Sequence, residues 1–392
     1  MPSRFFWFSL ALFLGFTAVM LAGCGGAGSA PGSSLALAAS APGPKLHGPI
    51  RVQGVTAAQV SGLSPKQIRH AYGFDTLSTT GAGQTIAIED SCGSPHIQSD
   101  LNVFCKQFGL PTTTIQIVYP AGKPSSYDPY GPSWASETSL DVEWAHAIAP
   151  GAKLLLAVDN DAQSLSPGLA CIDYAAAHAA QVSISWGYGE WNGQTSYDFH
   201  FNKPGVTFCA ATGDSGGAAT WPATNPNVVA VGGTHLSVDS AGNRLGESAW
   251  QDSSGGRSRF ESEPYWQQGW QSSGWREAPD VSADAALTPG VALYDSVPDE
   301  GYVGWQTVGG TSVATPLWAA LFALANSLRA SHLNGAPPAL YTLGNPSQLS
   351  SYFFDITTGA NRRYSTTYGY DLVTGLGTPR ASALVRALAA AY

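Results

Sequence analysis

Short apolar segments alternate with helical patterns along most of the chain, and this alternation restricts the possible folds. Several of the apolar segments are continuous, as is typical of parallel strands buried on both faces. The strand candidates are Thr85–Glu89, Thr114–Tyr119, Lys153–Val158, Val182–Trp186, Val206–Ala211 and Val228–Val231. Helical patterns lie at 97–108, 135–148, 165–180 and 312–330. We therefore predict an α/β protein in which a parallel sheet is flanked by helices joined through right-handed crossovers.

Composition narrows the classes of function. Charged residues make up only 11% of the chain, against roughly 25% in average soluble proteins. A surface with few charges is typical of exported proteins. It also favours stability at acidic pH, because few carboxylates must then be protonated. The net charge is −9 and no basic stripe is present, which argues against a nucleic-acid partner. Residues 240–300 are rich in Gly, Ser, Pro and Trp and predict substrate-facing loops.

The N-terminus has the pattern of an export signal. Arg4 precedes the apolar run Phe5–Leu21, which ends in Leu-Ala-Gly-Cys24. This ending resembles the bacterial lipobox, which implies cleavage before Cys24, a lipid on its sulfur and anchoring to the bacterial cell envelope. The alternative is an ordinary signal peptide with a chance cysteine. We expect a signal peptide at 1–23, a flexible tether at 24–62 and a folded body at 63–392.

Four further cysteines follow Cys24. In an exported chain, Cys92, Cys105, Cys171 and Cys209 suggest disulfides, for which three pairings exist. Cys92 and Cys105 bracket a predicted helix, so we favour Cys92–Cys105 and Cys171–Cys209. No spacing typical of a zinc site occurs.

A glycine-rich turn before an apolar helix carries the first candidate catalytic residue. The segment reads Gly309-Gly310-Thr311-Ser312, followed by Val-Ala-Thr-Pro and the run Leu317–Leu328. A serine at a helix start lies beside unpaired backbone N–H groups, which suit a developing oxyanion. The alternative is that Ser312 or Thr311 only caps the helix.

A pair of acids provides the second candidate. Glu137 and Asp141 are four residues apart, so on a helix they share one face. Leu140, Trp144 and Ile148 form an adjacent apolar stripe, which directs the carboxyl pair toward the interior. Two acids there raise at least one pKa and can share a proton. The alternative is two solvated acids on a helix face.

The third candidate is Asp214, which lies in Thr212-Gly213-Asp214-Ser215-Gly216-Gly217 after the strand candidate Val206–Ala211. An acid at the carboxyl end of a parallel strand lies where α/β sheets bind ligands. The alternative is the acid of an Asx-turn.

Taken together, these segments resemble the sedolisins, or serine-carboxyl peptidases. The acid pair, the Asp and the Ser occur in the family's order, and Trp221-Pro222-Ala223 resembles its aromatic-Pro-Ala step, although Trp is not the usual aromatic there. The resemblance covers about Leu63 to the C-terminus. It implies a subtilisin-like fold in a single catalytic domain, hydrolysis of protein or peptide substrates at acidic pH, and a monomer.

The resemblance also assigns roles. It implies that Ser312 is the nucleophile and forms an acyl-enzyme, that Glu137 is its base, that Asp141 orients Glu137, and that protonated Asp214 donates to the oxyanion. Asp90 follows the first strand candidate. Related subtilisins carry an acid at the matching strand end, so we interpret Asp90 as a residue that supports the Glu137/Asp141 pair without contacting the substrate.

A calcium site is implied near the C-terminus. The ligands carried over from the family are the carboxylates of Asp355 and Asp371 and the carbonyls of Ile356, Thr367 and Gly369. The alternative is a glycine-rich turn that closes the domain. Sedolisins also carry a long N-terminal prodomain, whereas about forty residues separate Cys24 from the predicted body, so we expect a member lacking a long prodomain.

Two other functions remain open at this point. The first is a Ser-His-Asp hydrolase of subtilisin type, for which Gly233-Thr234-His235 offers a histidine, although no helix follows to present it. The second is a catalytically silent, lipid-anchored binding protein on the same scaffold.

Overall fold

A large mixed sheet forms the centre of the protein. The computed structural model describes residues 46–47, 51–54, 60–125, 133–299 and 302–391. The sheet has eight strands in the order β10-β9-β8-β6-β3-β5-β4, with β13 also paired to β9. All neighbouring pairs are parallel except β9 with β10. Its strands are β3 (Thr85–Ser91), β4 (Ile115–Val118), β5 (Lys153–Asp159), β6 (Gln181–Ile184), β8 (Thr207–Ala211), β9 (Val228–Val238), β10 (Arg244–Ala249) and β13 (Val281–Asp284).

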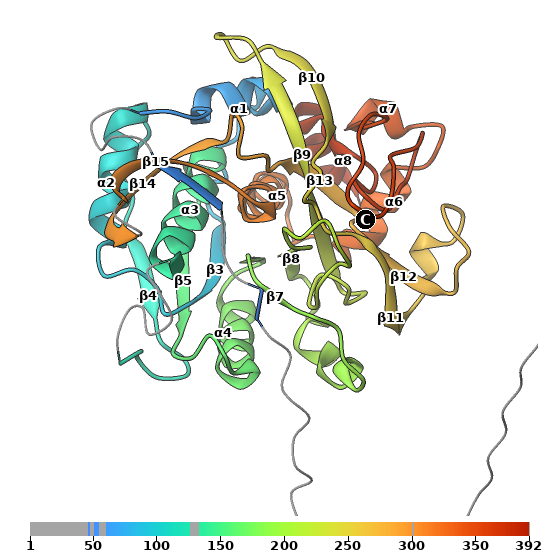
Figure 1. Cartoon of the computed structure of the whole chain (residues 1–392), viewed down its shortest axis with the longest axis horizontal. Coiled ribbons are helices and arrows are strands. Elements are labelled where there is room, and N and C mark those ends of the chain that lie inside the picture. Colours follow the sequence, from blue (N-terminus) through green and yellow to red (C-terminus); the bar gives the residue numbers. More distant parts are fainter. Residues whose placement is uncertain (1–45, 48–50, 55–59, 126–132, 300–301, 392) are drawn as a thin grey trace, which may run out of the picture. The chain divides into compact units, whose positions relative to one another are not determined.

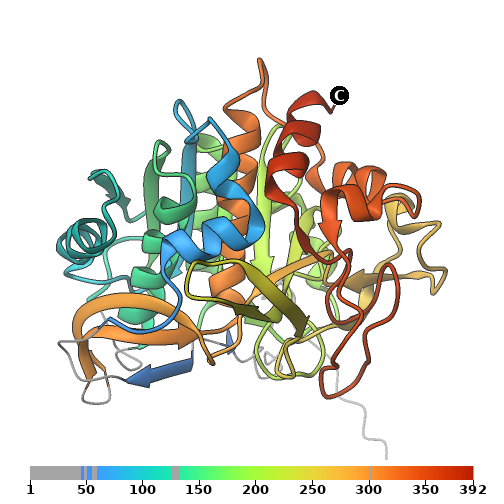
Figure 2. The same cartoon turned by 90° about the horizontal axis from the view of Figure 1, so that it is seen from above.

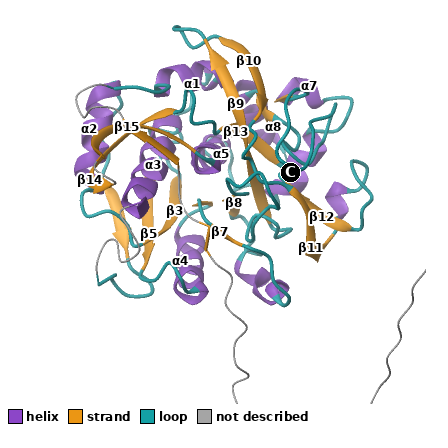
Figure 3. Ribbon diagram, viewed as in Figure 1, coloured by secondary structure: helices purple, strands orange, loops and turns teal. Residues whose placement is uncertain are grey.

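Helices cover both faces of this sheet (Figures 1 and 3). The helices are α1 (Pro65–Tyr72), α2 (Ile97–Phe108), α3 (Ser133–Ile148), α4 (Leu165–His178), α5 (Thr311–Asn326), α6 (Ala336–Leu343), α7 (Leu349–Tyr352) and α8 (Ala381–Ala390). Side chains alternate along each strand, so Ile86 and Ile88 join the apolar cluster of α3 and α5, whereas Ala87 joins that of α4. The predicted α/β class with a helix-flanked parallel sheet is confirmed.

Helix α5 runs through the interior (Figure 2). Every residue from Thr311 to Asn326 is buried, because the helix packs against α3, α8 and the strands β6, β8 and β9. An apolar surface on all sides is what such a position requires. Any side chain placed at the start of α5 is therefore held rigidly.

The segment 240–300 contains more strand than predicted. Besides β10 and β13, it holds β11 (Gly256–Ser262), β12 (Trp275–Ala278) and β14 (Val291–Asp299). Strands β11 and β12 pair with each other, and β14 pairs with β15 (Tyr302–Gly309). Two short strands, β16 (Phe353–Phe354) and β17 (Thr378–Pro379), pair near the C-terminus. Glycine and serine here occur within edge strands as well as in loops, which composition alone does not distinguish.

Part of the expected tether belongs to the body. Strand β1 (Leu46–His47) pairs with β7 (Gly187–Tyr188), and β2 (Arg51–Gly54) pairs with β15. The compact unit that contains the sheet begins at Pro44, upstream of the predicted start at Leu63. Cys24 and the predicted signal peptide lie outside the described residues. Within the described part of the chain, no helix has the length and apolar character needed to cross a membrane.

Neither predicted disulfide is present, since Cys105, Cys171 and Cys209 are free thiols. The sheet explains this result. Cys92 belongs to the cluster under α4 and Cys105 to the cluster under α3 and α5. Likewise, Cys171 lies on α4, whereas the side chain of Cys209 joins the cluster on the other face. The two cysteines of each favoured pair thus pack on different faces of the sheet.

Candidate active site

Ser312 lies in the first turn of α5. The residue before the helix is Gly310, with φ 148° and ψ 160° and no side-chain cap, so the helix is not capped by Thr311 or Ser312. Gly309 is required by a close approach, because a Cβ there would lie 2.6 Å from the backbone nitrogen of Leu287. The Ser312 side chain is buried, and its hydroxyl donates to the carbonyl oxygen of Ser185 at 3.4 Å. The glycines thus place a serine hydroxyl at the start of a buried helix.

Asp214 is held against the same helix start. It follows β8 in the chain and is half-buried. Its Oδ1 accepts two hydrogen bonds from Thr311, one from the backbone N–H and one from Oγ1, both at 2.8 Å. The Thr311 hydroxyl in turn accepts from the N–H of Gly213 at 3.2 Å. These bonds cross 97 residues of sequence, so Asp214 fixes the β8 loop to the residue before Ser312.

Glu137 and Asp141 lie on α3 and are fully buried. Helix α3 packs directly against α5 and against β3, so the alternative of two solvated acids is wrong. Burial raises the pKa of Asp141 well above its usual range, and the charges of Asp90 and Glu137 raise it further. These shifts favour the protonated form of Asp141.

Ser185 contacts both Ser312 and Asp141, and sequence reasoning missed it. Its carbonyl oxygen accepts from Ser312, and its hydroxyl side chain lies near enough to Asp141 to lower the pKa of that carboxyl in part. It stands after β6, in the strand candidate Val182–Trp186. Position at the carboxyl end of a central parallel strand was the only signal available.

Asp90 lies near enough to the acid pair for its charge to raise the pKa of Asp141. It is fully buried near the end of β3, and both of its oxygens lack a hydrogen-bond partner. Burial raises the pKa of Asp90 to about 7, with a further contribution from the charge of Asp159, while Thr138 on α3 opposes the shift. Asp90 therefore adds a third acid to the cluster at α3.

A second buried acid pair lies on the opposite face of the sheet and was missed by sequence reasoning. Glu89 accepts a short hydrogen bond from the indole N–H of Trp186. Burial and the charge of Asp159 raise the pKa of Glu89 well above its usual range. Asp159 accepts from the hydroxyl of Ser91 at 2.7 Å. Because neighbouring strand residues point to opposite faces, Glu89 and Asp90 belong to different environments.

His235 does not join this site. It is exposed on β9, opposite Ser248 of β10, whereas Ser312 is buried within the first turn of α5. A buried serine cannot transfer a proton to a histidine on an exposed strand face. The hydrolase with a Ser-His-Asp triad is therefore not favoured.

The carboxylates of Asp355 and Asp371 both bind backbone N–H groups of the short segment 367–369 in the C-terminal loop. Oδ2 of Asp355 accepts from the N–H of Gly369 at 3.0 Å, and Oδ2 of Asp371 accepts from the N–H of Thr367 at 3.2 Å. Oδ1 of Asp355 is buried without a partner. Burial raises the pKa of both carboxyls, that of Asp371 to about 6. Ile356 is buried beside Asp355.

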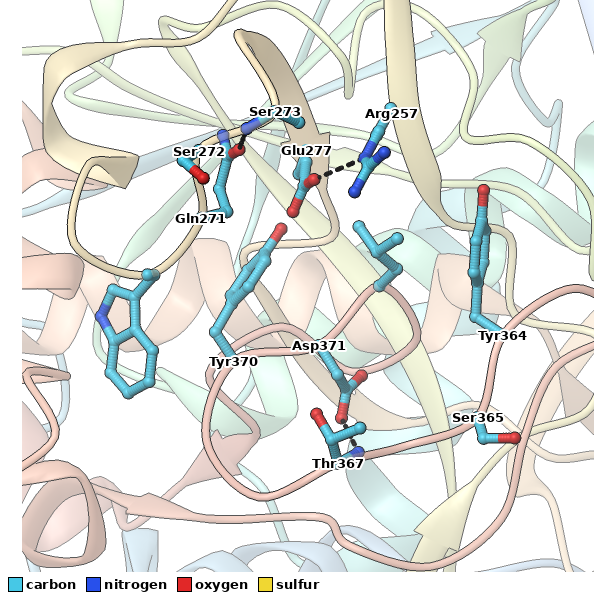
Figure 4. A pocket seen from close by; sticks show the side chains of 12 residues that line it. Arg257, Gln271, Ser272, Ser273, Glu277, Tyr364, Ser365, Thr367, Tyr370 and Asp371 are labelled. Carbon is cyan, nitrogen blue, oxygen red and sulfur yellow. Dashed lines mark hydrogen bonds and ion pairs between the residues drawn. The ribbon is translucent and has the colours of Figure 1, made fainter.

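A polar cavity of about 570 Å³ adjoins this loop. Figure 4 shows Asp371 and Thr367 on one side of it, and the ion pair of Arg257 with Glu277 on the other. Among the described residues, no group of three or more His, Cys, Asp or Glu side chains could hold a metal. A metal here therefore needs backbone carbonyls as well, which hard cations such as calcium accept.

Comparison with known proteins decides the family. Residues 117–351 match the subtilase family. The chain belongs to this family. The sequence is 32% identical over 385 residues to kumamolisin of Bacillus sp. strain MN-32, covering 88% of this chain and 66% of the relative. It is 27% identical over 365 residues to sedolisin of Pseudomonas sp. strain 101, covering 83% of this chain and 60% of the relative.

A solved structure agrees with these relatives. It is described as Pseudomonas sedolisin, a serine-carboxyl proteinase, complexed with two molecules of pseudo-iodotyrostatin. It matches with a TM-score of 0.72 and 26% identity, over 84% of this chain and 98% of that chain. Within the subtilase family, this chain thus resembles the sedolisins in both sequence and fold. It spans less than two thirds of the length of the curated relatives named above.

Proposed function

We propose that this protein is a serine-carboxyl peptidase that hydrolyses peptide bonds at acidic pH through an acyl-enzyme on Ser312. One observation carries the proposal. Asp214 bonds to Thr311, the residue before Ser312, at the start of α5. Helix α3, which carries the buried acids Glu137 and Asp141, packs against α5. A nucleophile, an oxyanion donor and a base are the groups that acyl transfer requires.

The first step is proton removal from Ser312. Burial and neighbouring acids raise the pKa of Asp141 and favour its protonated form, so in the proposed mechanism Asp141 is the neutral partner that orients Glu137. Glu137 then remains the acceptor and takes the hydroxyl proton as Ser312 attacks the peptide carbonyl. Asp141 thereby has the orienting role that an acid has toward histidine in other serine peptidases.

The second requirement is a donor for the oxyanion. Oδ1 of Asp214 accepts both bonds from Thr311, so the donating proton of Asp214 belongs on Oδ2. Only a protonated carboxyl can donate to an oxyanion, which links activity to acidic pH. Glu137 gives the proton it took from Ser312 to the departing amine, and the C–N bond breaks to leave the acyl-enzyme. Water then attacks the acyl-enzyme while Glu137 accepts its proton. Glu137 returns this proton to the Ser312 oxygen as the ester bond breaks and the carboxylic acid product leaves.

Calcium binding at the C-terminal loop is part of the proposal. The unpartnered buried Oδ1 of Asp355 and the carboxylate of Asp371 fit a hard cation, with the carbonyls of Ile356, Thr367 and Gly369 as further ligands. Bound calcium would supply structural stabilisation of the loop and no chemistry at Ser312.

We also propose that the protein is exported and anchored through lipid on Cys24. The support is the Leu-Ala-Gly-Cys ending of the apolar N-terminal run. Lipidation would hold the peptidase at the bacterial cell envelope, where protein or peptide substrates outside the cytoplasm are accessible.

A direct assay of peptide-bond hydrolysis distinguishes the proposed peptidase from the alternative, a catalytically silent binding protein. The purified protein is incubated with a denatured protein at pH 4, and new N-termini are identified by mass spectrometry. We expect cleavage by the unmodified protein and none by Ser312→Ala, with a circular dichroism spectrum unchanged between them. Equal fragment patterns from the two proteins, or no cleavage by either, would contradict the proposal.

A further inference from the structure

A short segment between β10 and β11 contacts the glycine-rich loop that follows β8. We call residues 213–217 of that loop the oxyanion loop and residues 252–255 the brace. The backbone N–H of Ser254 donates to the carbonyl oxygen of Gly213 at 2.8 Å. The hydroxyl of Ser254 accepts from the backbone N–H of Ser215 at 3.3 Å. The brace therefore binds the oxyanion loop on both sides of its aspartate.

The oxyanion loop needs such support because glycine gives its backbone many alternative conformations. Gly213 has φ 104° and Gly216 has φ 64°, values in the left-handed region that glycine adopts readily. Thr311 donates two hydrogen bonds to Oδ1 of Asp214, and these bonds locate that oxygen without fixing the direction of Oδ2. The direction of Oδ2 then depends on the backbone on either side of Asp214, which the brace holds.

The C-terminal loop holds the brace from another direction. Arg362 donates from Nε and from a terminal nitrogen to Oδ1 of Asp252, at 3.1 and 2.7 Å. The carbonyl oxygen of Asp252 accepts from the backbone N–H of Gly216 at 2.6 Å. The side-chain amide of Asn361 donates to the carbonyl oxygen of Ser253 at 3.0 Å. A Cβ on Gly216 would lie 2.7 Å from Cγ of Arg362, so the stem of this arginine also packs against the oxyanion loop.

We propose that Ser254 and Arg362 are positioning residues for Asp214. Ser254 acts on the oxyanion loop directly, and Arg362 acts through Asp252 of the brace. The inference rests on the proposed function and extends it, because contacts outside the catalytic groups align the oxyanion donor. Such a donor must lie within hydrogen-bond distance of the forming oxyanion, and a displacement of about 1 Å can cost roughly a hundredfold in rate. A loosened brace should therefore lower kcat and leave peptide binding unchanged.

Removal of the Ser254 hydroxyl tests the kinetic consequence. In Ser254→Ala we expect kcat for a peptide substrate to fall about tenfold to a hundredfold, with KM unchanged. In an Asp214→Ala background the same substitution should cause no further loss, because the donor that Ser254 positions is already absent. The control is Ser282→Ala, which removes an equally buried hydroxyl that donates to the carbonyl oxygen of Thr374 at 3.1 Å, and which should leave kcat unchanged. An unchanged kcat in Ser254→Ala, or equal losses with and without Asp214, would overturn the inference.

Hydrogen exchange separates this inference from the proposed chemistry. The side chain of Arg362 is 55% exposed, and so exposed an ion pair adds little to stability, so Arg362→Gln should fold. Deuterium uptake of this variant, of Ser254→Ala and of the control Arg363→Gln, which changes the neighbouring exposed arginine, is followed by mass spectrometry at pH 4. We expect exchange in residues 213–217 to be at least about fivefold faster in the first two variants, as for loss of one hydrogen bond, and unchanged in Arg363→Gln.

The outcomes of the exchange experiment are distinct from those of the activity assay. Unchanged exchange in both Arg362→Gln and Ser254→Ala would overturn the inference even if the unmodified protein is an active peptidase. Faster exchange together with an inactive unmodified protein would support the hold of the brace on the oxyanion loop and reject the peptidase.

Discussion

At the scale of single residues, the sequence predicted the acids and the serine but not their connections. The i, i+4 spacing of Glu137 and Asp141 beside an apolar stripe was enough to predict a buried pair. The bond from Thr311 to Asp214 was not predictable, because it joins residues 97 positions apart. The contact between Trp186 and Glu89 was missed for the same reason, since Glu89 lies on β3 and Trp186 lies 97 residues later, after β6.

The role of Asp214 can be tested with two substitutions. Asp214→Asn keeps a donor at the same place that never ionises, so it should retain part of the activity and lose part of the decline of kcat on the alkaline side. Asp214→Ala should lose on the order of a hundred- to a thousand-fold in kcat, as expected for one missing oxyanion donor. The measurement is kcat from pH 3 to pH 8 for the three proteins. Nearly full activity of Asp214→Ala would remove Asp214 from the mechanism.

At the scale of elements, strand and helix types followed from hydrophobic pattern, whereas the direction of single side chains did not. The cysteines show why. Predicting Cys171–Cys209 required knowing that α4 covers one face of the sheet and that Cys209 points to the other. The pairing of β1 and β2 was hidden similarly, because a segment rich in Gly and Pro can still pair when an open strand edge lies beside it.

The C-terminal loop should depend on calcium. Chelation removes a ligand that binds only the folded state, so we expect the melting temperature to fall, with restoration by added calcium. Asp355→Asn removes the charge on the unpartnered Oδ1 and should make the protein insensitive to chelator. Thermal unfolding followed by fluorescence provides the readout. A melting temperature of the unmodified protein that does not respond to chelator would reject the calcium site.

At the scale of the whole molecule, the helix-flanked parallel sheet was predictable because continuous apolar strands alternate with helices. The same fold buries many acids. Burial raises the pKa of Asp284 to about 8, of Glu261 and Asp90 to about 7, and of Asp371 to about 6. Between pH 4 and these values, the folded state keeps protons that the unfolded chain has lost.

The free energy of unfolding should therefore be largest near or below pH 4 and fall as the pH rises through 6 to 8. We expect the melting temperature at pH 4 to exceed that at pH 8 by at least about 5 °C. In Asp284→Asn, which cannot lose a proton, this difference should be smaller. A melting temperature that rises from pH 4 to pH 8 would show that the buried acids are ionised in the folded protein.

The cellular location of the protein can also be tested at the scale of the whole molecule. Cys24→Ser removes the sulfur to which lipid would be attached, so we expect the variant to leave the membrane fraction or to remain unprocessed. Immunoblots of membrane and soluble fractions check this, with Cys105→Ser as the control because Cys105 lies in the folded body. A membrane fraction that is the same for all three proteins would refute lipid anchoring at Cys24.

The central claim is that carboxyl groups, without histidine, activate Ser312. The most direct test is the pH profile of kcat/KM for a peptide substrate, measured from pH 3 to pH 8 for the unmodified protein, Ser312→Ala and His235→Ala. We predict a maximum below about pH 5, because model Asp and Glu titrate near 3.9 and 4.3 and pairing raises one of them. Ser312→Ala should show no hydrolysis, and His235→Ala should follow the unmodified protein. A maximum at neutral pH that is lost in His235→Ala would contradict the account.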